Sequence, residues 1–320
     1  MSAEPEYIID RRKLKHRLNK WRFIAIAVAV LAILSYLMVD HKLAAKFGVA
    51  DQIARIDVNG IITDDKDRAD MLKRLAATPS VKAVLVRFNS PGGTTTGGEA
   101  LFTDLRKIAS TRPVVAVFGT MATSAAYMSG VAAEHIVARG NSITGSVGVI
   151  MQWAEVSDML SKLGVDMKEI KSGNLKAVPS PFQPLDEPAR ALTQEMIDES
   201  HKWFVDLVVS RRKIEPDRIP GFMEGRIYSG RQALEYGLID AIGDEEQALK
   251  WLYDVKKISA DLPVIPWQNS SEASGGLLGR ASAYLASLFG VDIAAIYERY
   301  GHSGLVSATE TGGLISKWRN

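Results

Sequence analysis

The sequence lacks cysteine altogether, and beyond its first 22 residues it lacks any excess of basic side chains. The missing cysteines exclude disulfide bonds, thiolate zinc sites and a cysteine nucleophile. Residues 1–22 hold seven Lys or Arg against three acidic residues, whereas the remaining 298 residues hold 32 basic and 34 acidic side chains. The bulk of the protein therefore has no basic excess of the kind that binds nucleic acid, and we expect no nucleic-acid partner.

A run without charged residues follows the basic N-terminus, over residues 23–39. Seventeen residues at a helical rise of about 1.5 Å span roughly 25 Å, which is enough for a short transmembrane helix. Because the basic side stays cytoplasmic, the sequence predicts a single-pass anchor in the cytoplasmic membrane, with residues 1–22 cytoplasmic and the chain beyond Asp40 on the extracytoplasmic side. A cleaved signal peptide is the rival interpretation, but no clear small-x-small cleavage site follows the apolar run.

Strand patterns and helix patterns alternate after the anchor. We expect strands over residues 53–58, 81–88, 114–118, 135–138 and 147–151, and helices over 69–77, 98–109 and 187–212, with a helix-like segment over 229–243. This alternation predicts βαβ units, and therefore an α/β fold in which helices cover a largely parallel sheet.

The composition changes near the C-terminus and divides the chain into domains. The main domain is expected over residues 46–257, a Pro-, Ser- and Gly-containing linker over 258–276, and a C-terminal helical tail over 277–320. No phosphate-binding GxxxxGK[ST] motif is present, so we expect no nucleotide cofactor, and no metal site is indicated either.

One serine, Ser124, stands among small residues in GTMATSAAYMSG, residues 119–130, directly after a strand pattern. Small residues at a strand-to-helix junction let another backbone approach the hydroxyl closely, which makes Ser124 a candidate nucleophile. Ser146, in TGSVGV, is the rival nucleophile, although we interpret it as a turn residue leading into a substrate-pairing strand. Ser90 is a weaker candidate. A serine hydroxyl is a weak nucleophile and needs an adjacent base.

The base is either a histidine or a lysine. Among the five histidines His135 follows Ser124 by eleven residues, but a structural role is the more common one for such a residue. A lysine, whose ordinary pKa is about 10.4, must lose its charge near pH 7 and therefore needs a dry, apolar site. Lys171 and Lys176 lie in IKSGNLKAVPSPFQPL, residues 170–185, and uncharged residues flank Lys176. Spacing alone does not select one of them.

Five motifs occur in an order and spacing that resembles the bacterial signal peptide peptidase (SppA) family in its short form. They are NSPGG, GTMATSAAYMSG, ITGSVGVI, KSGNLKAVPSPFQP and GRIYSGRQALEYGLIDAIG. The resemblance covers about residues 53–250. It implies an α/β fold of the Clp peptidase and crotonase type, with repeated ββα units, and a serine endopeptidase that degrades cleaved signal peptides through a Ser–Lys dyad. It assigns Ser124 as the nucleophile and Lys176 as the general base.

The glycines of SPGG follow a strand and can turn a backbone N–H toward a bound carbonyl. An oxyanion needs such donors about 2.7–3.1 Å away. We assign Gly93, with Gly92 as the alternative, together with the N–H of Ala125. The resemblance also implies a ring- or dome-shaped homo-oligomer, an octamer, in which Ser124 of one protomer pairs with Lys176 of the next. Sites complete within each chain are the alternative.

Two other functions stay open at this point. One is a crotonase-like acyl-CoA enzyme, which uses the same oxyanion arrangement and would be revealed by CoA binding. The other is a catalytically inactive, membrane-anchored scaffold, which a serine-reactive fluorophosphonate would leave unlabelled.

Overall fold

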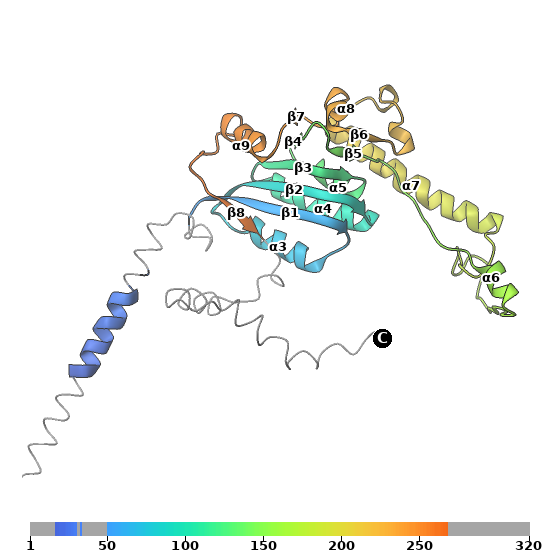
Figure 1. The fold of residues 1–320 in the computed structure, drawn as a ribbon, viewed down its shortest axis with the longest axis horizontal. Coiled ribbons are helices and arrows are strands. Elements are labelled where there is room, and N and C mark those ends of the chain that lie inside the picture. The colour runs from blue at the N-terminus through green and yellow to red at the C-terminus, as the bar shows by residue number, and fades with distance from the viewer. Residues whose placement is uncertain (1–16, 31–32, 34–49, 268–320) are drawn as a thin grey trace, which may run out of the picture. The chain divides into compact units, whose positions relative to one another are not determined.

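The computed structural model describes residues 17–30, 33 and 50–267 (Figure 1). The strands are β1 (Gln52–Ile62), β2 (Val81–Gly93), β3 (Val114–Thr123), β4 (His135–Ala138), β5 (Ile143–Gly145), β6 (Ile227–Ser229), β7 (Ala241–Ile242) and β8 (Val264–Trp267). The helices are α3 (Lys66–Ala76), α4 (Thr95–Ala109), α5 (Ala125–Gly130), α6 (Ser157–Lys162), α7 (Glu187–Arg212), α8 (Gly230–Glu235) and α9 (Glu245–Asp254), with 3-10 turns at Pro216–Arg218 and Phe222–Glu224.

The eight strands form one sheet in the order β6-β5-β3-β2-β1-β8, with β4 also paired to β3 and β7 paired to β4. Every pairing is parallel except that of β5 with β6. The prediction of an α/β fold with a largely parallel sheet is therefore confirmed. Strand β3 is the branch point, because one of its edges pairs with β2 while the other pairs first with β4 and then with β5.

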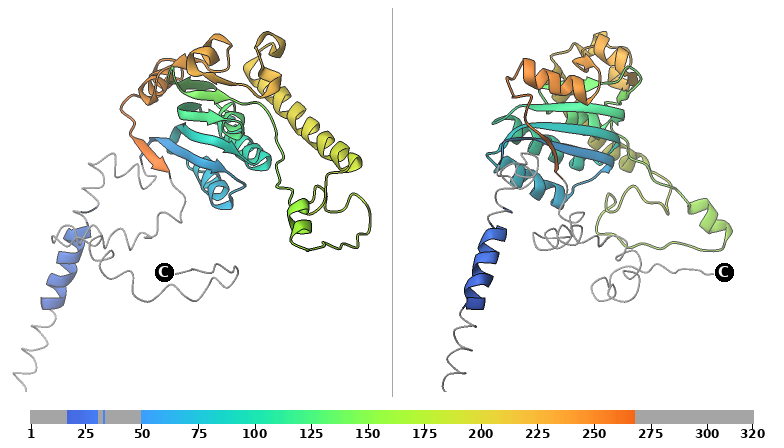
Figure 2. Two further views of the ribbon diagram at one scale, coloured as in Figure 1. Left: turned by 45° about the vertical axis from the view of Figure 1, so that its right-hand side comes forward. Right: turned by 60° about the vertical axis from the view of Figure 1, so that its left-hand side comes forward.

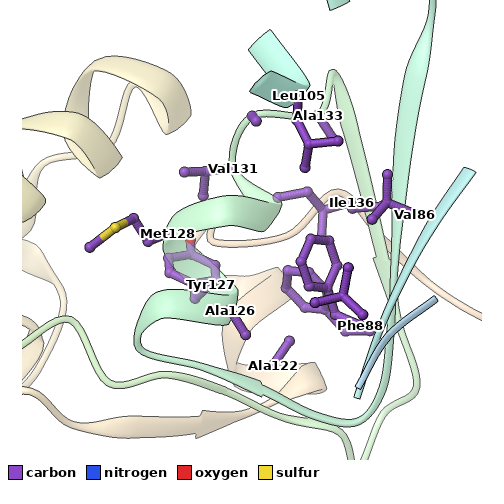
Figure 3. Close-up of a cluster of buried hydrophobic side chains, with 14 of the residues drawn as sticks. Val86, Phe88, Leu105, Ala122, Ala126, Tyr127, Met128, Val131, Ala133 and Ile136 are labelled. Atoms are coloured by element: carbon purple, nitrogen blue, oxygen red, sulfur yellow. The ribbon is translucent and has the colours of Figure 1, made fainter. Parts of the chain in front are cut away.

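Helices cover both faces of the sheet. Helices α3, α4 and α5 lie on one face and α9 lies on the other (Figures 1 and 2). The β2 segment Val81–Phe88 is buried at six of its eight positions, as expected for a parallel strand with helices on both sides. The larger core contains an aromatic row in which Phe88, Phe118 and Tyr127 meet edge to face, with ring centroids 5.9 and 6.1 Å apart. Figure 3 labels Phe88 and Tyr127 among the side chains of this core.

Three expected element boundaries are wrong. The strand expected over 53–58 continues to Ile62 through a bulge between Asn59 and Ile61, which Gly60 accommodates with φ +68°. The strand predicted over 147–151 does not form, because left-handed backbone at Gly145 and Ser146 turns the chain out of the sheet, and β5 lies earlier. The helix-like segment 229–243 contains only the short helix α8, followed by a turn and then β7.

Strand β8 lies within the predicted linker and pairs with β1 at the edge of the sheet. Pro266 is tolerated there because an edge strand has one side without a partner. Residues 17–30 are helical, and within the described part of the chain no helix is both long and apolar enough to cross a membrane. The predicted span 23–39 lies partly outside the described residues, and the tail 277–320 lies wholly outside them, so both stay predictions.

An arm, residues 148–186, connects β5 to α7 and contains α6. Helix α7 has 26 residues and spans about 39 Å. Its C-terminal part contributes Phe204, Val205 and Val208 to the core, while α6 lies beyond its N-terminal end, away from the sheet (Figures 1 and 2). The arm therefore extends outward from the body of the domain.

A charged network joins α7 to the start of β4. Arg212 donates two hydrogen bonds to the Asp240 carboxylate, at 2.9 and 2.7 Å, and the same carboxylate accepts the Ile136 N–H at 2.8 Å. Beside it the His135 ring stacks on Trp251 of α9, with centroids 4.7 Å apart. Burial lowers the pKa of His135, and the Arg212 charge lowers it further, while Asp240 acts in the opposite direction.

This arrangement predicts a loss of stability in mild acid. Because the pKa of folded His135 lies below its unfolded value of about 6.5, the unfolded state binds more protons, so the contribution is present above pH 6.5 and is lost as the pH falls. The Tm of the wild-type protein should fall more steeply between pH 7.5 and 5.5 than that of His135→Phe, which keeps an aromatic ring against Trp251 but cannot titrate. Equal slopes in the two proteins would contradict the assignment.

Candidate active site

Ser124 occupies the sharp junction between β3 and α5. Its φ of 53° and ψ of −124° lie in a region that residues other than glycine rarely adopt, which costs about 1–3 kcal/mol. The Ser124 N–H donates to the Gly145 carbonyl at 2.9 Å, and its own carbonyl accepts from the Met128 N–H at 2.9 Å. Ala125 and Ala126 are buried while Ser124 is partly exposed. The junction therefore presents the Ser124 hydroxyl at the surface on a fixed backbone.

The glycine loop lies directly against this serine. Gly92 has φ +115°, and a Cβ at that position would stand 2.8 Å from the Ser124 Cβ and 3.2 Å from the Ala125 N. Only glycine allows this approach. The structure thus brings Gly92 of the NSPGG motif against Ser124 and Ala125 of the GTMATSAAYMSG motif. The Gly92 N–H donates to the Ser90 Oγ at 3.1 Å, so of the two glycines Gly93 is favoured as the donor to an oxyanion.

Two arginines hold the far end of α5. Arg211 donates to the carbonyls of Val131 and Ala133 at 2.9 and 3.1 Å, and Arg106 donates to the Ala132 carbonyl at 3.1 Å. These carbonyls follow the end of the helix and have no partner within it, and cationic donors satisfy them. The six-residue helix that begins after Ser124 is therefore held at the end opposite the serine.

Tyr127 fixes α5 from its middle. Its hydroxyl donates to the Leu238 carbonyl at 2.9 Å, and complete burial raises the pKa of this hydroxyl. Tyr127 thus stays neutral and serves as a structural anchor, not as an acid or base.

Lys176 lies on the arm, between α6 and α7, and its side chain is exposed. Within the described residues its Nζ makes no hydrogen bond or ion pair, whereas the Lys171 Nζ pairs with Glu169 at 2.6 Å. Figures 1 and 2 show the segment between α6 and α7 extending away from the end of β3. Among the described residues no hydrogen bond or ion pair joins Lys176 to Ser124.

The structure also shows where the rival base and the rival nucleophiles lie. His135 is in register with Val115, nine residues before Ser124 along β3, so at about 3.3 Å per residue the two lie roughly 25–30 Å apart. This separation rules out His135 as the base for Ser124 of the same chain. Ser90 is fully buried, and its Oγ accepts a hydrogen bond from the Gly92 N–H. Ser146 has φ +54° and donates its N–H to the Arg226 carbonyl, as expected for a turn residue.

One contact at the site has no signal in the sequence. The Thr123 Oγ1 donates to the Pro91 carbonyl at 2.9 Å and ties the residue before Ser124 to the glycine loop. A threonine among small residues gives no hint of a partner 32 positions away. No group of acidic and histidine side chains suited to a metal ion occurs within the described residues.

Comparisons with known proteins identify the family to which the chain is similar. The sequence model of Peptidase family S49 matches residues 106–259, a stretch that contains Ser124 and Lys176. A protein of Synechocystis sp. that is named as a protease is 36% identical over 218 residues, covering 68% of this chain and 78% of that protein.

Two further relatives carry more specific names. A protein of Enterococcus faecium whose name is signal peptide peptidase SppA is 32% identical over 250 residues. The match covers 74% of this chain and 71% of that protein. Protease 4 of Haemophilus influenzae is 30% identical over 215 residues, which is 63% of this chain but only 34% of that protein. From the family match and the extent of these identities, the chain belongs to peptidase family S49, a family of serine proteases.

Proposed function

We propose that this protein is a membrane-anchored serine endopeptidase that cleaves remnant signal peptides outside the cytoplasm, with Ser124 as its nucleophile and Lys176 as its general base. The observation that carries the proposal is the strained backbone of Ser124 with Gly92 packed against it. This geometry brings the backbone of the glycine loop and of Ala125 beside the serine, as the oxyanion donors of acyl transfer require.

The chemistry proceeds in two halves. The neutral Lys176 amine takes the Ser124 proton as Oγ attacks the substrate carbonyl, and the N–H groups of Gly93 and Ala125 stabilise the oxyanion. The lysine then gives its proton to the leaving amine, which departs and leaves an ester on Ser124. In the second half water, deprotonated by the same lysine, attacks the ester, and the serine recovers its proton.

The nucleophile assignment is tested with a fluorophosphonate probe and a fluorogenic peptide. We expect Ser124→Ala to abolish both labelling and peptide cleavage, whereas Ser146→Ala keeps the label. Ser210→Ala, an exposed serine on α7, is the matched control and should behave as wild type. Labelling that survives Ser124→Ala but disappears in Ser146→Ala would transfer the role to the rival serine, and wild-type protein that neither labels nor cleaves would favour the scaffold.

The lysine is tested through its charge. Only a neutral amine can accept the Ser124 proton, so a side chain that cannot lose its charge should not replace the lysine. Lys176→Arg should be inactive although it keeps length and charge, since a guanidinium does not deprotonate. Lys171→Arg is the control, because that lysine is already paired with Glu169. Substantial activity in Lys176→Arg would remove Lys176 from the mechanism.

The position of Lys176 supports a site shared between two protomers. A lysine base needs a dry, apolar surrounding, and an exposed arm gains such a surrounding only where another surface covers it. The arm also presents many exposed apolar side chains, which favour contact with a second copy of the chain. These are Ile150, Met151, Trp153, Met159, Leu163, Val165, Met167, Ile170, Leu175 and Phe182. Protease 4, of which this chain spans about a third, has a length that accommodates more than one such domain.

Mixing two inactive variants tests the shared site. Ser124→Ala and Lys176→Ala proteins, unfolded and refolded together, should regain about a quarter of wild-type activity, because in a random closed ring a quarter of the interfaces pair an intact serine with an intact lysine. Ser124→Ala mixed with the double variant is the control and should stay inactive. Inactivity of the first mixture, with mixed oligomers confirmed by native mass spectrometry, would mean that the dyad forms within one chain.

The orientation of the chain in the membrane is tested by protease protection. Since seven basic residues precede the apolar run, residues 1–20 should lie in the cytoplasm and the catalytic domain outside it. In inverted membrane vesicles an added protease should therefore remove the N-terminus and leave residues 60–250 intact. Digestion of residues 60–250 in sealed vesicles would overturn the assignment.

A further inference from the structure

The peptide bond between Pro91 and Gly92 is held at both of its polar atoms. The Thr123 hydroxyl donates to its carbonyl oxygen at 2.9 Å, and its N–H donates to the Ser90 Oγ at 3.1 Å. Both side chains are buried, with Ser90 at 0% and Thr123 at 7% exposure. Because a peptide unit is planar, fixing the oxygen and the N–H fixes the orientation of the whole unit.

This peptide unit leads directly into the residues that face the nucleophile. Gly92 follows it with φ +115°, a conformation from which a glycine rotates easily because it has no Cβ. The Gly92 backbone lies against Ser124 and Ala125, and the next N–H along the chain is that of Gly93. If the unit before Gly92 rotated, the direction of the Gly93 N–H relative to Ser124 would change with it.

We propose that Thr123 is a positioning residue for the oxyanion site, and that it acts with Ser90 by fixing the Pro91–Gly92 peptide. Thr123 immediately precedes Ser124, so one hydrogen bond links the strand that carries the nucleophile to the loop that carries the donor. The nucleophile and the donor therefore keep their relative position. The inference rests on the proposed function, because it assigns a purpose to this link only if Ser124 is the nucleophile.

The test compares two substitutions of Thr123. Thr123→Val keeps the shape and removes the hydroxyl, and it should lower kcat by about 10- to 100-fold while changing KM by less than about twofold, since outright loss of an oxyanion donor costs about 100- to 1,000-fold. Thr123→Ser keeps the hydroxyl and should stay within about threefold of wild-type kcat. A purely structural role would instead lower the Tm and leave the kcat of the folded enzyme unchanged.

Ser90→Ala provides an independent approach to the same peptide unit. It should show the same selective loss of kcat, and the double variant Thr123→Val/Ser90→Ala should be little worse than the more impaired single variant, because both act on one peptide unit. Binding of a peptide aldehyde, whose adduct with Ser124 places an oxygen in the oxyanion site, should weaken in parallel with kcat. Binding of the matching peptide alcohol should not change.

Different results would contradict the positioning role of Thr123 and the proposed protease function. A kcat of Thr123→Val within twofold of wild type, or a Thr123→Ser variant as impaired as Thr123→Val, overturns the positioning role while Ser124 remains the nucleophile. Cleavage that survives Ser124→Ala overturns the proposed function and this inference together.

Discussion

Strand β3 is the constraint on which the rest of the site depends. It pairs with β2 along one edge and with β4 and then β5 along the other, so its end cannot shift without breaking the ladders on both sides. The chain then turns through the strained conformation of Ser124, at a cost of about 1–3 kcal/mol. Hydrogen bonds to Gly145 and Met128, and the arginines beyond α5, offset that cost and keep the hydroxyl in place.

Arginine side chains hold the ends of strands and helices throughout the body. Arg112 alone donates to the carbonyls of Leu75, Ala76, Thr78 and Val81, which joins the end of α3 and the start of β2 to the segment before β3. Burial lowers the pKa of Arg112, but the guanidinium has enough donors to satisfy several carbonyls at once. These contacts supply donors to the carbonyls at the end of α3 and the start of β2.

The body and the arm differ in their physical character, and the difference separates the two proposed catalytic groups. Ser124 lies between buried residues of β3 and α5, whereas Lys176 lies among exposed residues of an arm that extends away from the sheet. A serine needs a fixed backbone to present its hydroxyl. A basic lysine needs a dry surrounding that the arm of one chain does not supply. The proposed assembly with a second copy of the chain would satisfy both requirements.

The sequence by itself determined the α/β class, the succession of the main strands along the chain and the motifs that surround Ser124. Strands buried on both faces leave continuous apolar runs in the sequence, and glycines mark close approaches of the backbone. It could not predict that the chain leaves the sheet at Gly145, since the left-handed conformation at Ser146 accompanies a hydrogen bond from its N–H to the distant Arg226 carbonyl. Nor could it assign a partner to Thr123. Only the tertiary structure decided these features, because each depends on groups that are distant in sequence and meet only after the strands have paired.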